Sequence, residues 1–158
     1  MKRILLILTV LIGFSASAQR LSTTFTKDES SWRWDGNSIE TTFNDDWDDW
    51  KFGSIRIETT FSNDWDRWDV GSNTTLKTVF SNDFDEWEIR SGDQTIRVRA
   101  TFSNDFERWT ISGDADGYIR TVFSDNYESW DVDIDGDISD EAEAAIVFIA
   151  IFTAFHLQ

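Results

Sequence analysis

A phenylalanine followed seven residues later by a tryptophan occurs six times along the chain, and this repeat constrains the fold more than any other feature. Around the middle pairs the sequence is nearly constant, reading ETTFSNDWDRWDV at Glu58–Val70 and KTVFSNDFDEWEI at Lys77–Ile89. Self-similarity of this kind predicts an architecture in which each copy is one supersecondary unit. The six pairs are Phe25 and Trp32, Phe43 and Trp50, Phe61 and Trp68, Phe80 and Trp87, Phe102 and Trp109, and Phe123 and Trp130.

Each copy has the pattern of a β-hairpin. Before the phenylalanine, Ile57, Thr59 and Phe61 alternate with polar residues, and period-two alternation with β-branched residues predicts a strand. Ser-Asn-Asp follows and favours a turn. The alternation then resumes with Trp68 and Val70 as a second strand. Successive copies are 18 to 22 residues apart, and we expect the variation to lie in the turns that link the copies, where extra length costs least.

One face of every predicted strand is apolar. A sheet with one apolar face must bury it, and a sheet this wide, without proline, tends to curl and to remove its edges by closing into a barrel. The expected inner face includes Ile39, Phe43, Trp50, Phe52, Ile57, Phe61, Trp68 and Val70, and the expected outer face carries Glu40, Glu58, Lys77, Arg99 and Arg120.

The C-terminal segment predicts a helix that fills the barrel. Ser139 and the acidic residues after it form a favourable helix start, and the segment from Ala144 to Leu157 is apolar on every side. About 14 apolar residues are short for a membrane span, which needs roughly 20, so burial is favoured over membrane insertion. The predicted fold class is all-β with one C-terminal helix. It is a twelve-strand antiparallel meander barrel of six hairpins over residues 21–138, enclosing a core helix at 139–157.

The first eighteen residues have the pattern of an export signal. Lys2 and Arg3 precede the apolar run from Ile4 to Phe14, and small residues up to Ala18 suit cleavage before Gln19. The alternative is an N-terminal strand or helix of the core. We therefore expect a signal peptide at 1–18, a single domain at 19–158, and release into the periplasm or the exterior, because no cysteine follows the apolar run for lipid attachment.

Charge and cysteine content narrow the possible partners. The sequence has 30 acidic and 14 basic side chains, a net charge of −16. So acidic a surface repels nucleic acid and anionic lipid and suits divalent cations or cationic partners. Without cysteine, an exported chain must be stabilised by packing alone.

The hairpin text FSNDFDEWEI and the end of the chain resemble the LURP-one-related proteins, the tubby C-terminal domain and the phospholipid scramblases. The end reads TVFSDNYESWDVD from Thr121, then an acidic stretch, then EAAIVFIAI from Glu143. The resemblance implies a closed twelve-strand barrel threaded by a C-terminal helix. Tubby domains bind phosphoinositides through a cationic patch that has no counterpart in this sequence, so that activity is not expected here. Scramblases carry a calcium-binding acidic stretch before their helix.

The acidic stretch before the helix is a candidate calcium site. Asp131, Asp133, Asp135 and Asp137, with Gly136, follow the spacing of an EF-hand loop. The pattern then fails, because Ala142 stands where the bidentate glutamate should be. In the alternative, the first two aspartates lie on the solvent face of the last strand and the others form a turn before the helix cap.

One aromatic residue per hairpin follows the Ser-Asn-Asp turn and predicts an aromatic rim at one end of the barrel. Beside acidic residues such as Asp46 and Asp64, these rings suit a glycan or a protein partner. In the alternative, each ring packs over its neighbour and caps the core. The candidate ligand-binding residues are Trp47, Trp65, Phe84, Phe106 and Tyr127.

Nothing in the sequence favours an enzyme. There is no thiol nucleophile, the single histidine, His156, lies at the end of the apolar segment, and no nucleophile motif is present. Carboxylates recur in every copy, which indicates a solvated surface rather than one tuned site. We therefore predict a monomeric, non-enzymatic binding or structural module with no nucleic-acid partner. The alternative is a scramblase-like protein whose terminal helix engages lipid.

Overall fold

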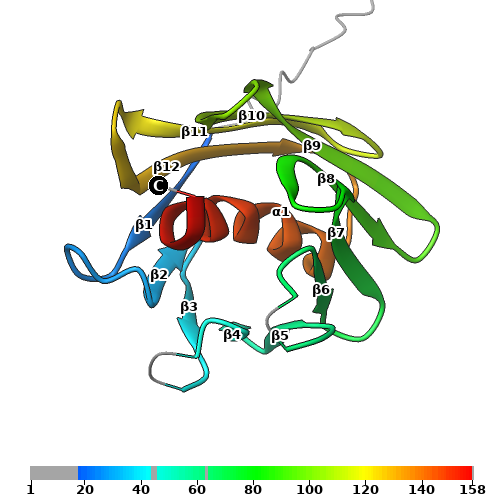
Figure 1. Cartoon of the computed structure of the whole chain (residues 1–158), viewed down its shortest axis with the longest axis horizontal. Coiled ribbons are helices and arrows are strands. Elements are labelled where there is room, and N and C mark those ends of the chain that lie inside the picture. Colours follow the sequence, from blue (N-terminus) through cyan, green and yellow to red (C-terminus); the bar gives the residue numbers. More distant parts are fainter. Residues whose placement is uncertain (1–17, 44–45, 63, 158) are drawn as a thin grey trace, which may run out of the picture.

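The computed structural model describes residues 18–43, 46–62 and 64–157, and they form a closed antiparallel barrel around one C-terminal helix (Figure 1). This confirms the predicted fold class. The strands are β1 (Gln19–Thr23), β2 (Ser31–Trp34), β3 (Asn37–Thr41), β4 (Asp49–Phe52), β5 (Ile55–Thr59), β6 (Arg67–Val70), β7 (Thr74–Phe80), β8 (Asp83–Ser91), β9 (Gln94–Phe102), β10 (Asp105–Gly113), β11 (Asp116–Phe123) and β12 (Asn126–Asp135).

Every strand pairs with its neighbours in the sequence, and β1 pairs with β12 to close the barrel. Leu21 lies opposite Trp130 in that closing pair. Each Phe–Trp copy is one hairpin, so hairpin 1 is β1 with β2 and hairpin 6 is β11 with β12. Closure leaves no unpaired sheet edge.

The hairpins differ in strand length, and the prediction that length variation lies in the linking turns is wrong for the longest copies. Residues 53–54 link β4 to β5, and residues 92–93 link β8 to β9, so the two linking turns are equally long. The extra residues instead lengthen the flanking strands. Trp50 and Phe52 are the inward residues of β4, whereas β8 directs Trp87, Ile89 and Ser91 inward. Adding residues in pairs preserves which face points to the core.

The core is formed by the six repeat tryptophans, by Trp34 and by aliphatic strand residues, all packed around the helix α1 (Asp140–Phe152). The helix continues as a π-helical turn over Thr153–Leu157. The helix has no exposed surface from Ala144 to Phe152. Phe148 packs edge-on against Trp50 and Trp68, with ring centres 5.7 and 4.8 Å apart. In the described part of the chain, no helix has the length and apolar character to cross a membrane.

The start of the helix is attached to the end of the barrel where the linking turns lie. Ser139 caps the helix by accepting a hydrogen bond from the Ala142 backbone N–H at 3.1 Å. Glu141 accepts backbone N–H bonds from Ser72 at 2.9 Å and Asn73 at 3.0 Å. Burial alone would raise the pKa of Glu141, but these bonds outweigh it and lower the pKa. The helix therefore runs from this linker end towards the opposite end, where the hairpin turns lie.

Candidate functional site: the phenylalanine rim

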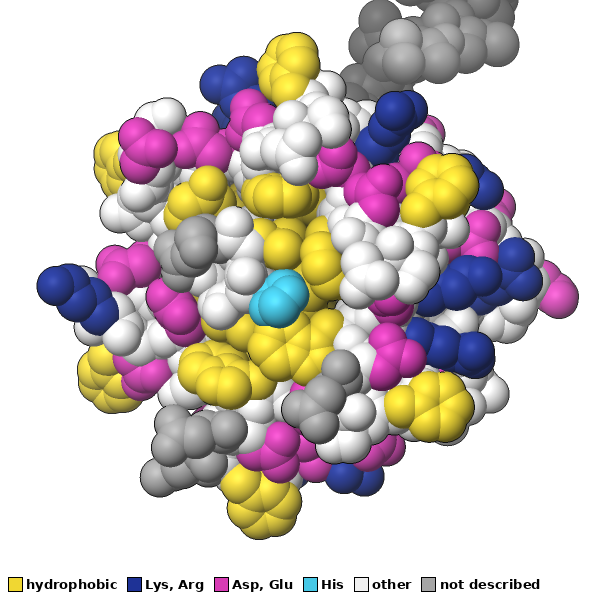
Figure 2. Space-filling model, in the orientation of Figure 1, with side chains coloured by type: hydrophobic (Ala, Val, Ile, Leu, Met, Phe, Trp, Pro, Cys, Tyr) yellow, Lys and Arg dark blue, Asp and Glu magenta, His cyan; other side chains and the backbone are white. Residues whose placement is uncertain are grey.

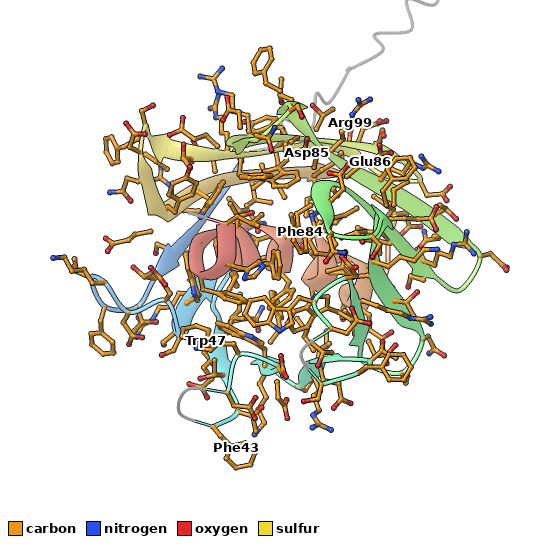
Figure 3. The ribbon with its side chains drawn as sticks, viewed as in Figure 1. Phe43, Trp47, Phe84, Asp85, Glu86 and Arg99 are labelled. Atoms are coloured by element: carbon orange, nitrogen blue, oxygen red, sulfur yellow. The ribbon has the colours of Figure 1, made fainter. Side chains whose placement is uncertain are left out.

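The six repeated phenylalanines are exposed, although the period-two pattern predicted an inward position for Phe43 and Phe61. That prediction is wrong. The six side chains are 62–67% exposed, while the six tryptophans seven residues later are at most 1% exposed. Figure 2 shows apolar side chains spaced around the periphery of the hairpin-turn end, and Figure 3 shows Phe43 pointing away from the barrel. We call Phe25, Phe43, Phe61, Phe80, Phe102 and Phe123 the phenylalanine rim.

Turn geometry explains why the alternation fails at these positions. Each phenylalanine is the first residue of a turn, and in hairpin 3 the Asp64 N–H donates to the Phe61 carbonyl at 2.9 Å. In hairpin 4 the pairing register shifts between Thr78, which is buried, and Phe80, which is exposed. Such a bulge bends the strand and changes where its side chains point. In hairpins 1, 4, 5 and 6 the third turn residue has positive φ, as at Asn82 with φ 56°, which asparagine tolerates.

The fourth turn residue fixes the start of the second strand. In every hairpin its side-chain oxygen accepts the backbone N–H two residues later, as in Asp83 to Asp85 at 3.0 Å. The equivalent acceptors in the other hairpins are Asp28, Asp46, Asp64, Asp105 and Asn126. The tryptophan is then locked in five hairpins by its indole N–H, which donates to the carbonyl three residues before it, as in Trp68 to Trp65 at 3.0 Å. These bonds account for the fixed spacing of seven residues.

A second set of carboxylates joins the turns of hairpins 3 to 6 to one another and to the turn of hairpin 1. Asp66 in hairpin 3 accepts the backbone N–H of Asn82 in hairpin 4 at 3.0 Å, and Asp85 accepts that of Asn104 at 3.0 Å. Glu107 accepts the N–H of Asp125 in the same way. Glu128 joins hairpin 6 to hairpin 1 by accepting the N–H of Lys27 at 2.7 Å. We call Asp66, Asp85, Glu107 and Glu128 the clasp carboxylates. They hold adjacent rim turns together.

From the sequence, the repeated carboxylates are expected to form a solvated surface, and their role in joining the turns is not predicted. A signal was present: the position five residues after the phenylalanine is Asp or Glu in hairpins 2 to 6. A purely solvated position has no need to stay acidic, because any polar residue would serve.

The five aromatic residues predicted as a ligand-binding rim are half-buried and pack against the core. Trp47 stacks on Phe155 with ring centres 5.0 Å apart, and Phe84 lies 5.2 Å from Phe152. Trp65 contacts His156 at 4.0 Å between ring centres. Phe106 and Tyr127 pack on the tryptophans three residues after them. Trp47, Trp65 and Phe84 thus cap the helix end, and Phe106 and Tyr127 cover core tryptophans. This is the packing expected in the alternative, and a ligand-binding role for the five rings stays a prediction.

Negative charge accumulates around the rim. In the described part of the chain, the ion pairs involve other carboxylates, such as Asp49 with Arg56 and Glu88 with Lys77, and none involves a clasp carboxylate. The Arg56 hydrogen bond is the main cause that lowers the pKa of Asp49. At the rim the pKa shift has the opposite sign. Burial raises the pKa of Tyr127, and nearby carboxylates raise it further.

The four candidate calcium ligands are distributed along the last strand and the loop after it. Asp131 is on β12 and forms ion pairs with Arg20 at 3.1 Å and Arg120 at 3.5 Å. Asp133 and Asp135 follow on the same strand, and Asp137 lies in the loop before the helix. Across residues 18–43, 46–62 and 64–157, no group of three or more His, Cys, Asp or Glu side chains is arranged to hold a metal ion.

Comparison of this chain with protein-family models, with curated proteins and with solved structures found no match.

Proposed function

We propose that this protein is an exported binding module whose phenylalanine rim contacts a component of the cell envelope or of the exterior. The observation that carries the proposal is the equal exposure of six phenylalanines at equivalent positions around one end of the barrel. Scattered single apolar residues on a surface are ordinary, but a repeated apolar set that core packing does not use is typical of an interaction surface.

Export is supported by the leader-like residues 1–18, which apart from Ala18 lie outside the described residues. The first strand begins at Gln19, directly after the expected cleavage point. We also propose that the module acts as a monomer and without catalysis. In support, His156 contacts the rings of Trp65, Phe84 and Phe152 and has no hydrogen-bond partner within the described residues, so nothing there prepares it as a base.

The scramblase-like alternative has less support. Ile146, Phe148 and Ile151 are fully buried, so the terminal helix could reach lipid only if the barrel opened. The resemblance to LURP-one-related, tubby and scramblase proteins stays a prediction, and it concerns the barrel layout rather than a shared activity.

The test compares the protein, expressed from its full sequence, with the triple variant Phe61→Ser, Phe80→Ser, Phe102→Ser. Each is sedimented with washed, insoluble envelope material from the cells that produce it, over a range of protein concentrations. We expect the triple variant to bind about tenfold more weakly or worse, since three apolar contacts are lost. Thermal melts check that both proteins are folded. A wild-type protein that stays in the supernatant, or a folded triple variant that sediments equally, would refute the proposal.

A structural calcium site at Asp131–Asp137 also stays a prediction. A metal that binds only the folded state raises the melting temperature. The wild-type protein should therefore have a higher melting temperature in millimolar calcium than in chelator. The double variant Asp133→Asn, Asp135→Asn should have the same melting temperature in both. Equal melting temperatures of the wild-type protein in chelator and in calcium would refute the calcium site, without consequence for the barrel or the phenylalanine rim.

A further inference from the structure

A groove on the outer wall separates hairpin 4 from hairpin 5 directly beneath the phenylalanine rim. Its volume is about 660 Å³, and Phe80 at its upper edge is 63% exposed. Figure 3 shows Asp85, Glu86 and Arg99 gathered on the outside of the barrel in this region. Thr101, Thr110 and Ser112 contribute hydroxyl groups to the same groove.

Several polar groups in this groove are not used by the fold. The guanidinium of Arg99 forms no ion pair or hydrogen bond among the described residues, although Glu86 lies opposite it in the β8–β9 register. Glu86 is instead bound by Arg97 at 3.0 Å, and Asp85 serves as a clasp carboxylate. The hydroxyls of Thr101 and Thr110 likewise have no hydrogen-bond partner in the described part of the chain. Arg99 therefore offers a planar set of donors beside spare hydroxyl donors and acceptors.

We propose that this groove binds a neutral polysaccharide chain, with the Phe80 ring packing on a pyranose face and Arg99 bonding its hydroxyls. The proposal rests on the binding role of the phenylalanine rim and names the partner. A sugar ring has an apolar C–H face and polar edges, which match a phenyl ring above a groove lined with hydroxyl, carboxylate and guanidinium groups. The net charge of −16 disfavours an acidic polymer. The unpaired guanidinium in the groove disfavours a lysine- or arginine-rich peptide.

The equivalent groove between hairpins 5 and 6 provides an internal control. It is smaller, at about 280 Å³, and Arg120 takes the place of Arg99. Arg120 is already occupied, because it pairs with Asp131 at 3.5 Å and lies 4.9 Å from the centre of the Tyr118 ring. The serines do not differ, because Ser124 is bonded to Glu107 and the equivalent Ser103 is bonded to Asp85. The arginine of this repeat position is therefore free in one groove and engaged in the next.

The experiment measures binding of full-length protein to a panel of soluble neutral polysaccharides: dextran, laminarin, hydroxyethylcellulose, galactomannan and arabinoxylan. Affinity electrophoresis and titration calorimetry give the dissociation constants. We expect at least one polymer to be bound and the affinity to fall about tenfold in Phe80→Ala and in Arg99→Ala. The matched variant Arg120→Ala should bind like the wild type. Thermal melts confirm that all three variants are folded.

Two further probes separate failure of this proposal from failure of the binding role. If polylysine or zwitterionic vesicles bind through the phenylalanine rim and no polysaccharide does, the groove assignment is overturned and the binding module stands. If a polysaccharide binds equally to Arg99→Ala and Arg120→Ala variants, the groove is not its site. If none of the probes and no envelope material is bound, both proposals fail.

Discussion

The six tryptophans and the six rim phenylalanines occur in the same repeat, in equal number and at a fixed spacing, yet their environments are opposite. The tryptophans have at most 1% of their surface exposed, and the phenylalanines about two thirds. Repetition therefore has two different causes in this chain. The tryptophan recurs because each hairpin must fill one part of the core. The phenylalanine recurs although the core does not need it, which identifies it as the part of the repeat available for contact.

The largest expected effect is on stability, and it distinguishes the buried tryptophan of a hairpin from its exposed phenylalanine. Trp68→Ala removes the ring that packs 4.8 Å from Phe148 and should lower the free energy of unfolding by ~3–5 kcal/mol. Phe61→Ala, in the same hairpin, should change it by less than about 0.5 kcal/mol, because the side chain is already in water. Urea unfolding of the two variants measures both values. A Phe61→Ala loss as large as that of Trp68→Ala would show that the rim is part of the architecture.

The next effect concerns the linker end, where the helix is attached. Gly71 has φ 61°, and a Cβ there would lie 2.2 Å from the Glu141 carboxylate oxygen. Gly71→Ala should therefore cost more than the roughly 1 kcal/mol that a left-handed backbone alone imposes on alanine. Gly92→Ala is the matched control, because its φ is 57° and no atom lies within 4 Å of the added Cβ. Equal melting temperatures for the two variants would contradict a role for Glu141 in anchoring the helix.

A smaller effect is expected at the clasp carboxylates. Asp66→Ala leaves the Asn82 backbone N–H and the Ser81 hydroxyl without their acceptor and should cost about 1–2 kcal/mol. Asp69→Ala, on the strand β6 that follows Asp66, removes a carboxylate that accepts no such bond among the described residues and should cost little. Hydrogen exchange at Asn82 should accelerate only in Asp66→Ala. Unchanged exchange would mean that the clasp bonds do not order the rim turns.

The smallest effects depend on pH and distinguish two neighbouring glutamates of the helix start. The pKa of Glu141 is lowered from its ordinary value of 4.5, so its stabilisation is present above pH 4.5 and is lost as the pH falls through the folded-state pKa. The pKa of Glu143 is raised, chiefly by burial, so its contribution is present below pH 4.5 and is lost as the pH rises. Glu141→Gln should destabilise at pH 7, and Glu143→Gln should stabilise. Melts from pH 3 to pH 7 test the opposite signs.

The fold followed from the sequence because its signals are long-range and repeated. The tryptophan spacing, the alternation at Trp68 and Val70, and the all-apolar helix each specify burial, and burial on one face is sufficient to predict a closed barrel. The phenylalanine rim could not be obtained in the same way. Phe61 and Phe80 directly precede a turn, where a bulge or a loop interrupts the period of two, and alternation carries no information past that point. The bonding role of Asp66 was hidden for another reason, since its partner belongs to the next hairpin.

Closure through β1 and β12 makes the first strand depend on the last. A chain that is synthesised from its N-terminus delivers β1 first, and this strand has no partner on one side until β12 arrives. The helix that fills the centre follows later still. The barrel can therefore close only when the chain is long enough to include β12. A product that stops before Trp130 and Phe148 is an open sheet with its tryptophans in water. Proteases that act on unfolded segments should cut such an open sheet more readily than the closed barrel.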